Sequence, residues 1–399
     1  MTSRISTGQM FTQSLSTMLT RQKDLQHLQQ QLATGKKIVT AADNPVSAGN
    51  AVTLDRAVAK LEQFDLNGNT VQNRLNLQES VLTQVGDQLA RVKELTLQAN
   101  TDTLSDTDRN AIAIELKSIN ENLLSLANTQ DGGGRYLFGG TNDAGAPFSR
   151  SAGAISYNGD QTQKQVEIAP DMFVTDAKAG SELFMRIRTG SSGVDASAAA
   201  GNAGTGVIAG FSRSNAGGWN GADYSVVFTS ANTYEVHDAS SAVVSTGTYT
   251  AGETIAVGGL EMQIRGAPAN GDRFDIGAAG TRDIFSTISN LVSSLQSPAV
   301  TSTDKAERHN ALQSALRDVS TASDHLIDAR AEGGAQLASL DKAASMREAN
   351  TVTLKTTLSS LRDLDYAEAI TEYQLQSTAL QAAQSVFTKM QGMSLFSKI

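Results

Sequence analysis

The sequence predicts a mainly α-helical protein with one inserted β region, in which N- and C-terminal helices form a long rod or coiled coil and the β domain lies outward. Helical spacing at both ends of the 399-residue chain, two-residue alternation in its middle, and only 5 Pro residues indicate this class. The formal charge of −9 argues against a protein that binds the nucleic-acid backbone. The absence of Cys excludes disulfides, thiolate nucleophiles and iron–sulfur clusters.

The first predicted helix covers residues 11–33, which contain neither Gly nor Pro. A 3-4-3-4-3 spacing places one set of residues on a single stripe: Leu15, Met18, Gln22, Leu25, Gln29 and Leu32. Thr34-Gly35 is a helix stop. Ordering each residue costs roughly 1–2 kcal/mol, and burying a Leu side chain returns only roughly 1.5–3 kcal/mol. This helix therefore needs a partner helix.

The partner is predicted at the other end of the chain, over residues 368–391, which also contain neither Gly nor Pro. The same spacing recurs there, at Tyr373, Gln376, Leu380, Ala383, Phe387 and Met390. Polar residues within an apolar stripe lower stability and specify the register of the helices. We expect the apolar members of the two stripes to form the assembly interface: Leu15, Met18, Leu25, Leu32, Tyr373, Leu380, Phe387 and Met390.

Further helices flank the middle of the chain. Apolar spacing predicts helices over residues 54–92, with Gly68 as the weak point, and from Ser105, where Asp108 completes a capping box. Another helix begins near Ile284 and is stopped by Pro298. A longer helical pattern follows over residues 312–361, and the pattern alone leaves open whether Gly333-Gly334 breaks it.

From Gly132 to Gly280 the chain is rich in Gly, Ser and Thr, and period-2 alternation predicts strands. Val257-Gly258-Gly259-Leu260 indicates a hairpin with a two-residue turn. We expect a small β segment over residues 154–168 and a loop or linker over residues 191–206. Three domains follow: a terminal helical core (1–44 with 363–399), a helical rod with a small β-hairpin region (45–180 with 281–362), and an inserted β domain (181–280).

The sequence indicates no catalytic, cofactor or metal site. Its four His residues are too scattered for a metal pair, and no hydrolase or phosphate-binding motif is present. No apolar run is long enough to span a bilayer, and residues 1–15 lack the apolar core of a cleaved signal peptide. We therefore expect a structural protein rather than an enzyme.

Several motifs resemble the flagellin-like hook–filament junction family of bacterial flagella, the hook-associated protein 3 family. They are Arg4-Ile5-Ser6-Thr7, Leu32-Ala33-Thr34-Gly35-Lys36-Lys37-Ile38 with Ala42-Asp43-Asn44-Pro45, Arg135-Tyr136-Leu137-Phe138-Gly139-Gly140, and Leu361-Arg362-Asp363-Leu364-Asp365-Tyr366-Ala367-Glu368. The segments Asn232-Thr233-Tyr234-Glu235-Val236 and Gly271-Asp272-Arg273-Phe274 are similar to a β insert of hook-associated proteins. Pro45 stands where a filament flagellin usually has Ala, which favours the junction family.

The resemblance implies copies stacked in a ring around a central axis, with hook-associated protein 1 on the hook side and flagellin on the filament side. It also implies an extracellular location in the flagellum, type III export without a cleaved signal, and a dedicated export chaperone. Two alternatives remain open at this point. One is flagellin itself, and the other is an adhesin-like insert that binds a ligand through Trp219, Tyr224, Tyr234 and Tyr249.

Overall fold

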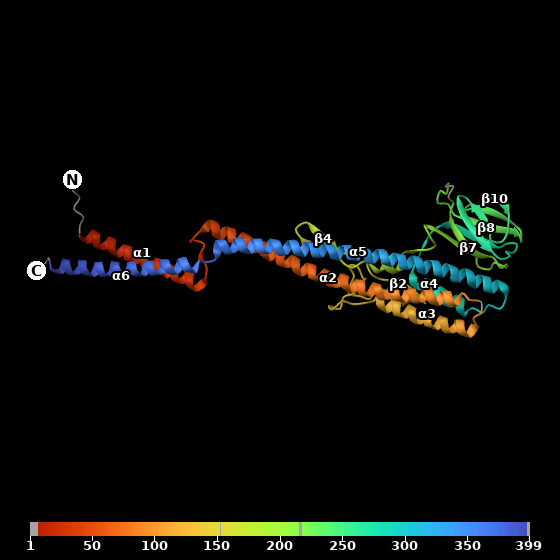
Figure 1. The fold of residues 1–399 in the computed structure, drawn as a ribbon, viewed down its shortest axis with the longest axis horizontal. Coiled ribbons are helices and arrows are strands. Elements are labelled where there is room, and N and C mark those ends of the chain that lie inside the picture. The colour runs from red at the N-terminus through yellow and green to blue at the C-terminus, as the bar shows by residue number, and fades with distance from the viewer. Residues whose placement is uncertain (1–6, 102, 152, 215–217, 397–399) are drawn as a thin grey trace. The chain divides into compact units, whose positions relative to one another are not determined.

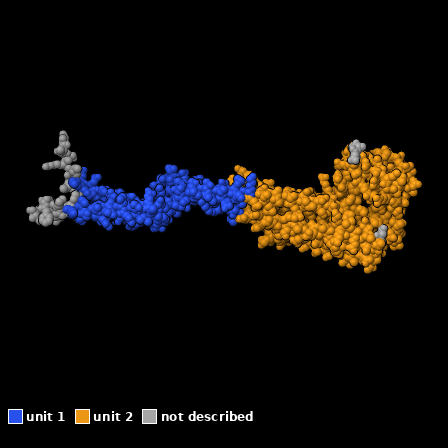
Figure 2. All heavy atoms as spheres, in the orientation of Figure 1, with its two compact units in different colours: residues 1–66, 342–399 blue, residues 67–341 orange. Residues whose placement is uncertain are grey.

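The computed structural model describes residues 7–396 apart from 102, 152 and 215–217, and it describes the side chains within residues 8–389. The chain divides into two compact units, residues 1–66 with 342–399 and residues 67–341 (Figure 2). The predicted class is confirmed, because long helices at both ends of the chain flank an inserted β-rich region (Figure 1).

The first unit contains the terminal helices α1 (Thr7–Thr34) and α6 (Tyr366–Phe396), which lie side by side (Figure 1). The Phe11 and Phe387 rings are 5.0 Å apart, and the Gln29 amide donates to the Tyr373 hydroxyl at 3.0 Å. Residue numbers rise on α1 as they fall on α6, so the two helices are antiparallel.

The same unit contains the start of α2 (Pro45–Ala99) and the end of α5 (Ser302–Arg362), which also run antiparallel. Their outer contacts are ion pairs, Arg347 with Asp65 at 3.2 Å and Arg362 with Asp55 at 3.5 Å. Val58, Leu61, Phe64 and Leu358 are buried in this unit. Its two helix pairs therefore have few fully buried apolar side chains, and most of their residues face solvent.

The second unit is built on the remaining parts of α2 and α5 together with α3 (Asp106–Ala127) and α4 (Ile284–Gln296). Large side chains on all four helices share one core, including Leu82, Leu89, Leu116, Leu123, Ile288, Leu291 and Val319. The predicted capping box at the start of α3 is confirmed, because Asp108 N donates to Ser105 Oγ and Ser105 N donates to the Asp108 carboxylate, both at 3.2 Å.

Neither predicted weak point interrupts a helix. Helix α2 is continuous through Gly68, and α5 is continuous through Gly333-Gly334. A Gly inside a helix costs only about 1 kcal/mol relative to Ala, and the packing of each long helix exceeds that cost. At Gly333 a Cβ atom would lie 3.4 Å from Gln78 Nε2, an ordinary contact distance, and at Gly334 it would meet nothing within 4 Å, so neither position requires Gly for packing.

Two small antiparallel hairpins follow α3, β1 (Phe148–Ser151) with β2 (Ala154–Tyr157) and β3 (Gln165–Ala169) with β4 (Met172–Thr175). A short π-helix, η1 (Ser181–Met185), places Leu183 and Phe184 in the helical core. The predicted β segment is thus larger than residues 154–168, and it begins at Phe148.

The larger β insert contains a five-stranded sheet in the order β10-β9-β8-β13-β6 and a three-stranded sheet in the order β11-β12-β7. Their bounds are β6 (Val194–Ala198), β7 (Val207–Arg213), β8 (Tyr224–Ser230), β9 (Thr233–Asp238), β10 (Val243–Thr248), β11 (Thr254–Val257), β12 (Leu260–Arg265) and β13 (Arg273–Ala278). A two-stranded ladder of β5 (Ile187–Arg188) and β14 (Thr281–Arg282) joins the ends of the insert.

The insert has a separate core formed by residues of its own strands and of the segment between β10 and β11, such as Val226, Phe228, Val257, Met262 and Phe274. The Val257–Leu260 hairpin is confirmed. The prediction that residues 191–206 form only a loop or linker is wrong, because β6 pairs with β13. Strand β6 has the sequence VDASA, whose small residues lack the β-branched signal that predicts strands. The three-domain division stays a prediction.

Candidate assembly surface

Helices α1 and α6 contact each other, and most of the residues predicted for the assembly interface are among the less exposed residues of the two helices. Leu25 is buried and Leu15 is 39 % exposed. Met18, Leu32, Tyr373, Leu380 and Phe387 are partly buried. Met390 lies within α6, but its side chain is outside the described residues. The stripe therefore holds the two helices against each other, and it leaves apolar surface accessible.

Polar residues within this contact set its register. Arg21 Nη1 donates to Gln376 Oε1 at 2.9 Å, and Gln376 Nε2 donates to Glu372 at 2.7 Å. Together with the Gln29–Tyr373 bond, these contacts tie α1 and α6 at two levels. A shift by one helical turn would break both bonds, so the polar residues specify one antiparallel alignment.

A second apolar face on the same helices was missed by the sequence reasoning. Leu19 is 59 % exposed on α1, and Leu375 and Val386 are 63 % and 57 % exposed on α6. Leu375 and Val386 are eleven residues apart, about three helical turns, so they share one face. Exposed large apolar side chains of this kind are candidates for contact with another protein. The eleven-residue spacing places the two residues on one face, but only the position of α1 shows that this face is exposed.

A joint lies where α1 ends and α6 begins. Gly35 has φ +67°, a conformation that favours Gly, and its N–H donates to Gln31 O at 2.8 Å to close the last turn of α1. Lys37 N donates to Arg362 O at 2.7 Å, and Leu364 N donates to Gly35 O at 3.0 Å. The two chain segments that leave the terminal helix pair are thus bonded to each other.

The loop between α1 and α2 is ordered by Asp43 and Asn44. The Asp43 carboxylate accepts from Thr40 N at 2.7 Å and from Val39 N at 2.9 Å, and these backbone hydrogen bonds, that of Thr40 first, lower the pKa of Asp43. Asn44 Oδ1 accepts from Ser47 N at 3.0 Å, which caps α2, and Pro45 is its first residue. The Ala42-Asp43-Asn44-Pro45 motif is therefore a turn and a helix cap.

Comparisons with known proteins match both helical ends. The bacterial flagellin N-terminal helical region matches residues 5–143, and the bacterial flagellin C-terminal helical region matches residues 316–397. Flagellar hook-associated protein 3 of Escherichia coli strain K12 is 26% identical over 98% of both chains.

Solved structures give the same relationship, one of them at higher identity. The crystal structure of FlgL from Xanthomonas campestris is 58% identical, with a TM-score of 0.74 over 77% of this chain and 99% of that chain. The chain belongs to the FlgL, or hook-associated protein 3, family. The flagellar junction protein FlgL from Legionella pneumophila is 26% identical, with a TM-score of 0.69 over 79% of this chain and 100% of that chain.

As a member of the FlgL family, the protein is a structural protein of the bacterial flagellum and not an enzyme. Among the described residues, no group of three or more His, Asp or Glu side chains could hold a metal ion. Three of the His side chains have structural partners, since His237 lies 3.2 Å from Glu235, His309 2.7 Å from the Asn100 amide, and His325 2.9 Å from Glu182 O. Within the described ranges, no helix of this FlgL-family chain is long and apolar enough to cross a membrane.

The aromatic residues considered for ligand binding in the insert have structural roles in this FlgL-family member. Tyr249 is buried and its hydroxyl donates to Gly266 O at 2.9 Å. Tyr224, Tyr234 and Trp219 pack against the core of the insert. Trp219 also lies under the Arg213 guanidinium, 4.7 Å from its ring. These contacts explain the four aromatic residues as packing groups.

Proposed function

We propose that this protein joins hook-associated protein 1 on the hook side to flagellin on the filament side, as a ring of identical copies. The paired helices α1 and α6 provide the surfaces that meet neighbouring subunits around a central axis. The β insert faces outward in this arrangement. The family relationship supports the junction role, and the identity of the neighbour on each side follows from the resemblance.

The observation that carries the proposal is the apolar surface of the α1–α6 pair. In water, side chains such as Leu19, Leu375 and Val386 gain roughly 1.5–3 kcal/mol each when a neighbour covers them fully. These three positions recur in every copy of a ring, so covering them favours assembly.

The proposed interface has two parts with different tasks. Leu15, Met18, Leu25, Leu32, Tyr373, Leu380, Phe387 and Met390 are proposed to hold α1 and α6 together in the register that assembly requires. Leu19, Leu375 and Val386 are proposed to contact the neighbouring subunit directly. A charge at Leu25 should therefore separate the helix pair, whereas a charge at Leu375 should leave the pair intact and block docking.

We propose export through the flagellar type III apparatus as an unfolded chain, with a dedicated chaperone that protects the C-terminal helix before export. A chain without Cys suits export in the unfolded state, because it cannot form a disulfide that would hold it folded before export. The exposed apolar residues of α6 give a chaperone a surface to cover in the cell.

Deletion of the gene in the source bacterium tests the junction role. Electron microscopy should show hooks without filaments, and flagellin should accumulate in the medium. A strain that carries the intact gene on a plasmid is the control and should regain filaments. Filaments that attach normally to hooks in the deletion strain would contradict the proposal.

A further inference from the structure

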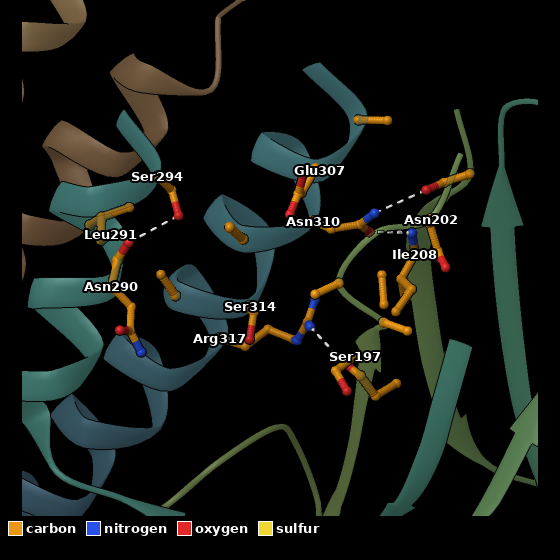
Figure 3. A pocket seen from close by; sticks show the side chains of 18 of the residues that line it. Ser197, Asn202, Ile208, Asn290, Leu291, Ser294, Glu307, Asn310, Ser314 and Arg317 are labelled. Carbon is orange, nitrogen blue, oxygen red and sulfur yellow. Dashed lines mark hydrogen bonds between the residues drawn. The ribbon is translucent and has the colours of Figure 1, made fainter. Parts of the chain in front are cut away.

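The β insert and the helices of the second unit meet along α5, and several side-chain hydrogen bonds cross their contact. Three α5 side chains bond to the backbone of the insert. Thr303 Oγ1 donates to Ala203 O at 2.9 Å. Asn310 Nδ2 donates to Gly206 O at 2.9 Å, and Arg317 Nη2 donates to Ala196 O at 3.2 Å (Figure 3). The three residues are seven apart, so they lie on one face of α5.

Asn310 takes the place of a missing strand. Strand β7 is the edge of its three-stranded sheet, and an edge strand has unpaired backbone groups. The Asn310 amide accepts from Ile208 N at 2.9 Å while it donates to Gly206 O, as a neighbouring strand would. One side chain on α5 thus satisfies both a donor and an acceptor of the insert.

The contact is also poorly filled. A cavity of about 250 Å³ lies between β6, β7, α4 and α5, lined by polar side chains such as Ser197, Asn290 and Ser314 and by apolar ones such as Ile208 and Leu291 (Figure 3). Arg317 Nε is buried there without a hydrogen-bond partner. Its guanidinium lies 4.9 Å from the Phe211 ring, and burial lowers the pKa of Arg317. A cavity and an unpaired buried donor both weaken the docked arrangement.

The insert does not need this contact for its own packing, because its buried core consists only of residues between Val194 and Ile276. Both ends of the insert are anchored separately at one point of α5. Gly190 N donates to Asp318 at 3.3 Å, Arg282 Nη1 donates to the same carboxylate at 2.7 Å, and Gly190 O accepts from Thr321 Oγ1 at 3.0 Å. The docking residues lie on the N-terminal side of that anchor.

We infer that the β insert is a separately packed module that Thr303, Asn310 and Arg317 clip onto α5, and that it detaches by pivoting about the anchor at Asp318 and Thr321. The clip consists of side-chain bonds to backbone groups beside a cavity, so three substitutions on α5 can remove it. The module therefore has a docked and a released orientation on the same helix. This inference does not depend on the junction role.

Spin labels can test the clip, because the chain has no Cys and labels attach only where Cys is introduced. Val244→Cys on β10 and Ile327→Cys on α5 are exposed sites, at 50 % and 60 %. We expect one narrow distance distribution between the two labels in the otherwise unchanged full-length chain. In the variant Thr303→Ala/Asn310→Ala/Arg317→Met, we expect a second, broader population.

Two controls make the result decisive. Ser323→Ala removes an α5 hydroxyl that bonds to Val319 O in the same helix, and it should leave the single distribution unchanged. Trp219 is the sole Trp and lies in the insert, so unchanged fluorescence shows that the insert stays folded in the triple variant. The inference fails if the triple variant keeps the narrow distribution, if the parent already shows a broad one, or if Trp219 emission shifts with the distances.

Discussion

Gly35→Ala should loosen the joint between the terminal helix pair and the helices that follow it. Gly35 has φ +67°, and a residue with a Cβ in the left-handed region costs roughly 1–2 kcal/mol. The new methyl group would also lie 2.7 Å from the Tyr366 hydroxyl. Tyr366 is 53 % exposed, so its side chain can move away at little cost, and the backbone conformation should dominate.

Native-state hydrogen exchange measures the effect at the joint itself. The Leu364 amide donates to Gly35 O and the Lys37 amide donates to Arg362 O, so both report local opening. A loss of about 1–2 kcal/mol corresponds to exchange that is roughly 5–30 times faster. The matched control is Gly49→Ala within α2, where a Cβ meets nothing within 4 Å and should stabilise the helix by up to about 1 kcal/mol.

The double variant Gly35→Ala/Tyr366→Phe separates the two causes. It removes the hydroxyl contact and keeps the backbone cost, so exchange should stay nearly as fast as in Gly35→Ala. Full recovery by Tyr366→Phe, or unchanged exchange in Gly35→Ala, would refute the reasoning that the left-handed conformation at residue 35 limits this position.

Two further variants test packing in the second unit. Ser105→Ala removes the capping box of α3 and should destabilise it by about 0.5–2 kcal/mol in urea unfolding followed by circular dichroism. Hydrogen bonds from Ser105 lower the pKa of Asp108 below its usual value. The ionised carboxylate therefore contributes to the stability of the fold above the usual pKa, and this contribution is lost as the pH falls through the lowered pKa. The penalty of Ser105→Ala should therefore shrink in acid, and an equal penalty at every pH would contradict this. Arg74 Nε lies 2.9 Å from the buried Asp176 carboxylate. Arg74→Met leaves this carboxylate without its cation and should lower the free energy of unfolding by about 3–5 kcal/mol. A loss below about 1 kcal/mol would show that the fold does not need the pair.

The sequence predicted those elements whose signals are local. Helix α1 ends at Thr34 because Gly35 adopts a conformation that other residues resist, and α3 begins after Ser105 because the capping box satisfies the free N–H groups there. The antiparallel partnership of α1 and α6 followed from two stripes with matching spacing and from the cost of ordering a helix alone.

Elements that depend on distant contacts were not predictable in the same way. Strand β6 exists because β13 lies beside it, and α5 continues through Gly333-Gly334 because the rest of the helix is held by its packing in both directions. In the candidate site, one stripe per helix was identified, and two of its residues, Tyr373 and Phe387, contact the other helix. The exposed face with Leu375 and Val386 emerged only when the position of the partner helix was known.

The central claim is that the exposed face of the terminal helix pair joins this protein to its neighbours in the flagellum. The most direct measurement is electron microscopy of a deletion strain that expresses Leu375→Asp/Val386→Asp. A matched control is Gln381→Asp, which adds one charge to an exposed position on a different face of α6. The account predicts hooks without filaments for the double variant and normal filaments for the control. Normal filaments with the double variant would contradict it.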